Sequence, residues 1–190
     1  MNRAPASGYR HVVAIDGGLR TGGMVALRVH PTLPSGRNAP WSQCVSADAI
    51  ELKPDHAMQV NEDRVRRTRL WSRWFRGHLD RWDPALLAVE ALSFPRGADA
   101  IICVSLAWGV IASEVERRSL PLVTVGPKQW RLTLAPNGSE QDAHMAAIRA
   151  IPTFLKHGQA IVSRLQLHAL DALGVAEWAL VSGAVRKVMP

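Results

Sequence analysis

The chain has 190 residues, which suits one domain with a sizeable core, and its 47% hydrophobic and 21% charged residues are ordinary for a soluble globular protein. Two cysteines, Cys44 and Cys103, are too few for a disulfide framework, and no apolar run approaches the length of a membrane span. The N-terminus is too short and too polar for a secretory signal, so we expect a cytoplasmic protein without membrane contacts.

The charge balance is basic, with 23 Lys and Arg residues against 16 Asp and Glu residues. Nearly all of the surplus is arginine, because the chain has only the lysines Lys53, Lys128, Lys156 and Lys187. Arginine binds phosphate well, which favours a nucleic-acid partner. A GC-rich coding sequence would produce the same bias, so composition leaves both explanations open.

The first predicted element is a buried strand over residues 11–16, which runs into the stretch VVAIDGGLRTGG (residues 12–23) and ends at Asp16. Glycines follow it, and residues 23–30 are predicted to form its hairpin partner. A third strand is predicted either within residues 41–45 or within residues 50–52.

Residues 63–82 are predicted to form a long helix, because apolar side chains recur along them at helical spacing. Four arginines fall on the opposite side of this helix: Arg66, Arg69, Arg73 and Arg76. Their face is either an ordinary solvated surface or a basic ridge for a phosphate backbone.

Residues 85–92, ALLAVEAL, predict a central strand that carries one acid, Glu90. Residues 98–118 predict a helix that is apolar almost all round, so one side covers the sheet and the other is available to a second subunit. A short strand at 122–125 and a last helix at 165–181 follow. This order of elements predicts an α/β fold, in which helices cover a mixed sheet.

Four residues have surroundings that favour a metal site: Asp16, Glu90, His168 and Asp171. Two are acids at strand ends, and the other two lie three residues apart on one face of the last helix. Buried carboxylates are costly unless they are paired or bind a metal. Oxygen ligands suit Mg²⁺ or Mn²⁺, and two such ions about 4 Å apart could activate water against a phosphodiester.

Each of these residues also has an ordinary structural explanation. Asp16 could hydrogen-bond to the glycine N–H groups of the turn. Glu90 could pair with Arg96, and His168 could be a half-buried histidine with a satisfied ring. The four together favour a functional site over these separate explanations.

Four segments, in this order, resemble the motifs of RuvC-type Holliday junction resolvases. VVAIDGGLRTGG resembles the first motif of the family, and LLAVEALSF resembles the second. VTVGPKQWRLTLAPNG resembles the segment after the fifth strand, and LHALDALGVAEWAL resembles the C-terminal helix. The order and spacing of the four match over nearly the whole chain, which adds specificity to motifs that are individually weak.

The resemblance implies an RNase H-like fold with a mixed five-stranded sheet, as a single nuclease domain over residues 1–190 with residues 1–10 flexible. It implies a crossover junction endodeoxyribonuclease that acts on branched DNA with two Mg²⁺ or Mn²⁺ ions per site. It also implies a homodimer through the helix at 98–118. The metal ligands of the family map onto Asp16, Glu90, His168 and Asp171.

Three positions depart from the family pattern. Gly17 stands where the family has proline, Phe94 is one position out of register, and no lysine is found within residues 139–142. In the family this lysine contacts DNA or the scissile phosphate, so its absence would weaken transition-state stabilisation unless an arginine substitutes. The predicted DNA contacts are Arg20, Arg66, Arg69, Arg73, Arg76, Phe94, Arg96, Lys128, Trp130 and Arg131.

Within this set, Phe94 or Trp130 is predicted to stack on bases at the crossover, although Phe94 could cap the core and Trp130 could pack under its loop. A phage-type nuclease that also cuts forks and flaps is a close variant of the main interpretation. Two other classes remain: a non-catalytic junction-binding protein with a vestigial site, and an actin-like ATPase. The chain is too short for the two domains of the latter.

Overall fold

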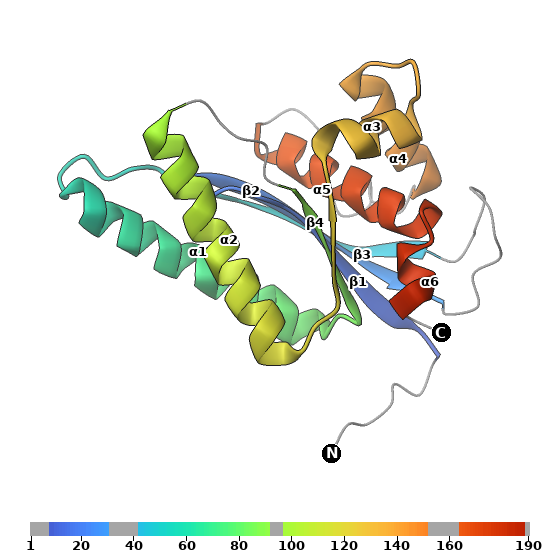
Figure 1. Cartoon of the computed structure of the whole chain (residues 1–190), viewed down its shortest axis with the longest axis horizontal. Coiled ribbons are helices and arrows are strands. Elements are labelled where there is room, and N and C mark those ends of the chain that lie inside the picture. The colour runs from blue at the N-terminus through green and yellow to red at the C-terminus, as the bar shows by residue number, and fades with distance from the viewer. Residues whose placement is uncertain (1–7, 31–41, 92–96, 152–163, 189–190) are drawn as a thin grey trace.

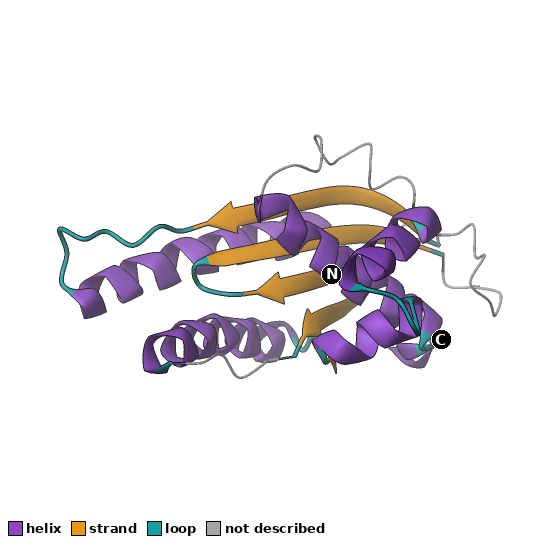
Figure 2. Cartoon of the chain, turned by 90° about the horizontal axis from the view of Figure 1, so that it is seen from above, coloured by secondary structure: helices purple, strands orange, loops and turns teal. Residues whose placement is uncertain are grey.

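The structure is a computed structural model that describes residues 8–30, 42–91, 97–151 and 164–188. Five strands form one mixed sheet in the order β3-β2-β1-β4-β5. Their bounds are β1 Arg10–Gly17, β2 Thr21–Val29, β3 Ser42–Glu51, β4 Leu86–Glu90 and β5 Leu122–Val125. β1, β2 and β3 are antiparallel neighbours, whereas β4 runs parallel to both β1 and β5. The strands lie side by side in Figure 2.

The sheet lies between two helical layers (Figure 1). One layer holds α1, Val60–Trp82, and α2, Ala98–Arg118. The other holds α3, Pro127–Leu134, α4, Glu140–Ala150, and α5, Arg164–Val181, with the short α6, Ala184–Val188, packed on α5. The predicted α/β class with a mixed five-stranded sheet is confirmed.

Side-chain alternation along β1 divides the interior into two cores. Val12 and Ala14 face α5, whereas Val13 and Ile15 face α1 and α2. All four side chains are fully buried, which explains why this strand is an almost continuous apolar run. The same alternation directs the next residue, Asp16, to the α5 side.

The third strand differs from its prediction. One continuous strand, β3, spans the region between the two predicted segments and pairs with β2 along its length. The polar residues Ser46 and Asp48 hide it in the sequence, because an edge strand is only half covered and tolerates them.

α2 also corrects a prediction, since it is long and apolar enough to cross a membrane, with a mean hydropathy of 1.6 over an 18-residue window. One such helix is weak evidence for a membrane, because core helices pass the same test. α2 packs Cys103, Ala107 and Ile111 against the sheet side of the protein. It also buries Glu114 fully, and that carboxylate is paired with Arg76, Arg117 and Arg118.

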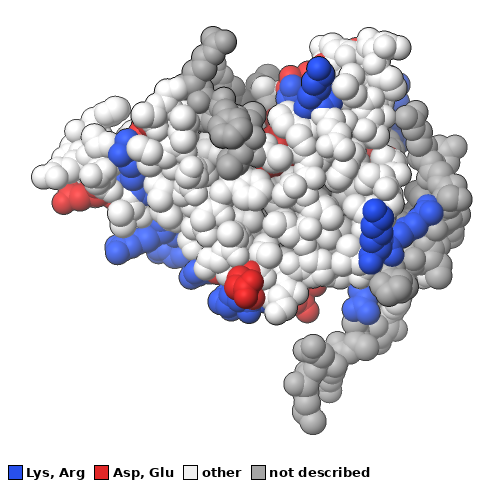
Figure 3. Space-filling view, viewed as in Figure 1, with Lys and Arg blue, Asp and Glu red and all other residues white. Residues whose placement is uncertain are grey.

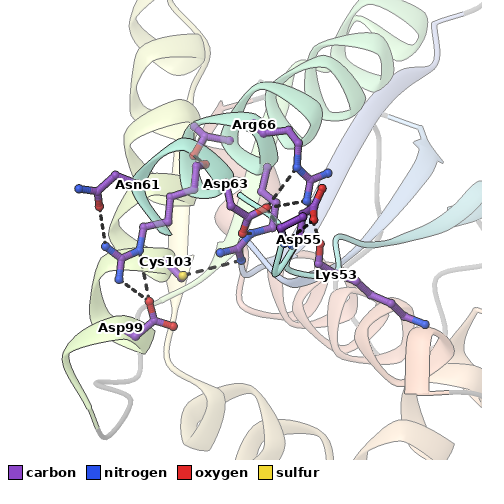
Figure 4. Close-up of polar contacts among 11 residues, drawn as sticks. Lys53, Asp55, Asn61, Asp63, Arg66, Asp99 and Cys103 are labelled. Atoms are coloured by element: carbon purple, nitrogen blue, oxygen red, sulfur yellow. Dashed lines mark hydrogen bonds and ion pairs between the residues drawn. The ribbon is translucent and has the colours of Figure 1, made fainter. Parts of the chain in front are cut away.

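A second cluster of charges anchors the start of α1 (Figure 4). Asp63 is buried and accepts hydrogen bonds from Arg66 and Arg67, at 2.6 and 2.7 Å. Arg66 also donates to the carbonyl of Lys53, which ties the helix to the segment before it. The layer formed by α1 and α2 is therefore held together by neutralised charge as well as by apolar packing.

Candidate active site

Asp16 and Glu90 are brought together by the parallel pairing of β1 with β4. Ile15 lies opposite Val89 in this register, so the next residue of each strand is one of the two acids. Asp16 and Glu90 are the next even-numbered residues after Ala14 and Ala88, whose side chains face α5. Both acids lie at the carboxyl ends of their strands. This edge of an α/β sheet is where ligands commonly bind.

α5 brings His168 and Asp171 to the same place from above the sheet. The approach depends on Gly23 of β2, which lies directly opposite Asp16 in the antiparallel register. A Cβ atom at position 23 would overlap the backbone of His168 and Ala169. The missing side chain therefore lets the helix backbone rest on the strand beside Asp16.

The resulting cluster is compact. The His168 Nδ1 and Asp16 Oδ2 atoms are 2.5 Å apart. One ligand atom from each of Asp16, His168 and Asp171 lies within 4.8 Å of the other two, which is close enough to share a metal ion. The side chains of Asp16, His168 and Asp171 are 17%, 30% and 14% exposed, so the cluster is half buried but open to solvent.

Electrostatics tie Glu90 to the same cluster. Burial and the negative charge of Asp16 raise the pKa of Glu90 to about 8, and Asp171 adds to the effect. The hydrogen bond to Asp16 raises the pKa of His168, so this imidazole is drawn toward its charged form. Negative charge is concentrated here, and among the described residues Arg131 approaches Asp171 while no arginine forms an ion pair with Asp16 or Glu90. A divalent cation stabilises such a setting.

Two buried rings lie behind the carboxylates. Trp130 Nε1 donates to Glu90 Oε1 at 2.9 Å, and His144 Nε2 lies 2.9 Å from Asp171 Oδ1. His144 is absent from the predicted site, because its partner is 27 residues away and no local motif marks it. The Ser139 capping box starts α4, but it shows only where the helix begins.

Basic residues flank one side of the cluster. Arg131 lies 3.0 Å from Glu140 and 3.9 Å from Asp171, and with Lys128 it lines a pocket of about 490 Å³. Glu140, His144 and Asp171 form a second trio with metal-ligand spacing, but the guanidinium of Arg131 already accompanies its two acids. Residues 139–142, where the family lysine is missing, start α4 through the Ser139–Asp142 capping box.

The predicted DNA contacts have different surroundings. Trp130 is fully buried, which contradicts the prediction that it stacks on bases. It packs inside the protein as the alternative held, but it lies on helix α3 and contacts α5 rather than a loop. Arg66 and Arg76 are paired with Asp63 and Glu114. Arg20, Arg69, Arg73 and Lys128 are exposed. Phe94 and Arg96 lie outside the described residues.

The chain was compared with protein families, with curated proteins and with solved structures. A profile of the family described as crossover junction endodeoxyribonuclease RuvC matches residues 12–177. A structure of T. thermophilus RuvC in complex with a Holliday junction substrate is similar with a TM-score of 0.69 and 17% identity, over 95% of this chain and 99% of that chain. The yeast mitochondrial Holliday junction resolvase is similar with a TM-score of 0.62 and 13% identity, over 93% and 80% of the two chains. A search of curated proteins gave no match.

The structural likeness establishes the fold, which is an RNase H-like α/β fold with a mixed five-stranded sheet. The family profile covers most of the chain and includes Asp16, Glu90, His168 and Asp171. The chain belongs to the RuvC family of crossover junction endodeoxyribonucleases.

Proposed function

We propose that this protein resolves four-way DNA junctions by a pair of phosphodiester nicks, with two Mg²⁺ or Mn²⁺ ions at each active site. The observation that carries the proposal is the cluster of Asp16, His168 and Asp171 at one half-buried edge of the sheet, with Glu90 interacting with Asp16 from the neighbouring strand. Carboxylate oxygens and one imidazole are donors that suit these two ions.

The chain's own residues would divide the work as follows. Asp16 and Asp171 would hold the ions together with His168, and Glu90 would complete the set from the neighbouring strand. The ions would activate a water molecule and stabilise the leaving oxygen. Hydrolysis adds that water across one P–O bond, and the departing oxygen leaves with a proton.

DNA would approach along the basic side of the cluster. Lys128 and Arg131 line the pocket beside Asp171, and their charges match the phosphates on either side of the cut. Arg131, which lies 3.9 Å from Asp171, and the exposed Lys128 would act in place of the missing family lysine. Lys and Arg side chains gather along the edge over α1 in Figure 3. Arg69 and Arg73 are exposed on this helix and would meet a more distant arm of the junction.

Paired nicks need two active sites, and α2 offers a surface for a second copy of the chain. Ile101 and Ile102 are 46% and 40% exposed on this helix. The face over α2 carries few charges in Figure 3. We propose that two copies associate through this helix and present their sites to opposing strands.

Asp16→Asn tests the reaction. The substitution keeps the size of the side chain but removes a charged metal ligand, so we expect cleavage of a labelled four-way junction in Mg²⁺ or Mn²⁺ to fall by at least 100-fold. Junction binding should persist in a gel-shift assay without metal. Duplex, flap and single-stranded DNA serve as controls, because paired symmetric nicks confined to the junction distinguish a resolvase from a general branched-DNA nuclease.

Two results would reject the proposal. Unchanged cleavage by Asp16→Asn would remove the assigned site. Tight junction binding by the parent protein with no nicking in either metal would instead support the non-catalytic junction-binding alternative.

A further inference from the structure

Two carboxylates of the candidate site are each held from behind by an aromatic ring. Trp130 Nε1 donates to Glu90 Oε1, and His144 Nε2 lies at hydrogen-bond distance from Asp171 Oδ1, both at 2.9 Å. An ionised carboxylate can only accept, so the His144 hydrogen is on Nε2 when Asp171 is charged. Each bond engages one oxygen of its carboxylate, and the Glu90 carboxyl also interacts with Asp16.

The two rings support each other. The Trp130 and His144 rings are stacked, with centroids 5.6 Å apart and planes inclined by 28°. Trp130 is fully buried, and His144 is 6% exposed. Neither ring can turn without disturbing the other, because both are enclosed in the core that α3, α4 and α5 share.

The backbone around the stack fixes it further. Trp130 sits against α5 at Gly174, where a Cβ atom would lie 2.5 Å from the Trp130 ring. His144 follows directly on the first turn of α4, which begins at a reciprocal capping box between Ser139 and Asp142. The ring pair therefore rests on two independently fixed helices.

We propose that Trp130 and His144 are positioning residues for the metal ligands. Their stack fixes Glu90 on β4 and Asp171 on α5 in one mutual geometry before any metal binds. This proposal rests on the proposed function, since it assigns a role to residues behind that site. Hydrogen-bond partners of metal ligands commonly change metal affinity or activity by about 10- to 100-fold when they are removed.

The stack also predicts coupling between two ligands that belong to different elements. Losing either ring should loosen both carboxylates, because each ring is held in place by the other. The combined effect of removing both hydrogen bonds should therefore be smaller than the product of the two separate effects.

The test compares variants that retain packing but remove a donor. Trp130→Phe and His144→Phe each retain a ring, whereas His144→Gln restores an N–H group that can reach Asp171. Mn²⁺ affinity is measured on the DNA-free protein by isothermal titration calorimetry, and the metal-free Tm is measured in parallel. Junction affinity in EDTA serves as the control. Arg131 of the proposed DNA surface lies over the Trp130 ring, 5.2 Å from its centroid, and Trp130→Phe keeps an aromatic ring beneath that guanidinium.

We expect each Phe variant to lose about 10-fold in Mn²⁺ affinity, the double variant to lose less than 100-fold, and His144→Gln to recover most of the loss. Junction affinity in EDTA should stay within twofold of the parent. If Trp130→Phe and His144→Phe both bind Mn²⁺ within twofold of the parent, the rings are merely core packing and the proposal is wrong, even if the Tm falls.

Asp16→Asn separates this failure from a failure of the proposed function. If Asp16→Asn loses Mn²⁺ binding while the ring variants retain it, only the positioning role is overturned. If Asp16→Asn also binds Mn²⁺ like the parent, the metal site is misplaced and both proposals fall.

Discussion

Two glutamates on opposite faces of the sheet show how the same side chain takes opposite roles. Glu114 on the α2 side is fully buried and contacts Arg76, Arg117 and Arg118. These arginines lower the pKa of Glu114 to about 2, although burial opposes the shift. Glu90 on the α5 side meets other acids instead, and burial with the charge of Asp16 raises its pKa to about 8.

The two glutamates differ in pKa because of the charges that surround them and not because of how deeply they are buried. A buried acid surrounded by cations is a structural tie whose charge is already neutralised. A buried acid surrounded by acids is an unfavourable arrangement in the free protein, and such arrangements concentrate at functional sites. The sheet thus separates a face that stabilises the fold from a face that is prepared for a cation.

Among the variants that test the difference between Glu90 and Glu114, Glu90→Gln should have the largest effect. The amide preserves the acceptor for Trp130 but removes a charged ligand, so we expect junction cleavage to fall by about 1000-fold. The metal-free variant should be more stable than the parent at pH 8 by about 1 kcal/mol, because it removes a charge that the fold disfavours. Cleavage assays test the loss of activity, and urea unfolding tests the gain in stability. A Glu90→Gln variant that is active and less stable than the parent would contradict the proposed difference between Glu90 and Glu114.

Gly23→Ala should disturb the α5 face alone. The new methyl group would push the helix backbone at His168 away from β2, with an expected cost of about 3 kcal/mol in the free energy of unfolding. Gly77→Ala is the matched control, since position 77 in α1 has open space and should gain about 0.5–1 kcal/mol. Thermal unfolding compares the two, and an equal response at both positions would show that α5 does not rest on Gly23.

Glu114→Gln should weaken the opposite face without harming the chemistry. We expect a loss of about 2 kcal/mol, because charge-assisted hydrogen bonds disappear while Arg76 and Arg117 remain half exposed and hydrated. Junction cleavage by the folded variant should stay within about twofold of the parent. Glu116→Gln, which changes an exposed acid on the same helix, is the control and should be close to neutral.

The smallest expected effect is on the pH dependence of stability, which should differ between Glu114 and Glu90. The pKa of Glu114 is lowered from 4.5 to about 2, so its contribution is complete above pH 4.5 and is lost as the pH falls toward 2. Glu90 acts in the opposite sense, since its pKa of about 8 makes the metal-free fold less stable as the pH rises from 4.5 to 8. Unfolding curves of Glu90→Gln and Glu114→Gln against pH would show whether each variant removes its own part of the profile.

Much of this site could be predicted from the sequence, because a buried strand is recognised by its apolar run and the acid at its end is easily seen. The apolar runs before Asp16 and Glu90 predict two strands that end in an acid, and the parallel pairing of those strands aligns the acids. The spacing of His168 and Asp171 predicts one helical face. None of these local signals shows that Gly23 is the point where the helix meets the sheet.

The parts that escaped prediction depend on partners remote in the chain. Trp130 and Glu90 are 40 residues apart, so an aromatic residue after a proline looks available for DNA when it is in fact buried. The arginine pattern on α1 has the same ambiguity. Helical spacing places Arg66 and Arg76 on one face with Arg69 and Arg73. Arg66 pairs with Asp63 three residues earlier on the same helix, whereas only the tertiary structure shows the pair between Arg76 and Glu114, 38 residues apart.

The pairing of Asp16 with His168 spans 152 residues, almost the length of the chain. Contacts of such high sequence separation carry a large entropic cost of closing the intervening chain. A nascent chain that has emerged only as far as α4 carries Asp16 and Glu90 but has neither His168 nor Asp171. The nuclease centre therefore cannot assemble before α5 has been synthesised. Cleavage activity would show that α5 is present and packed beside β1.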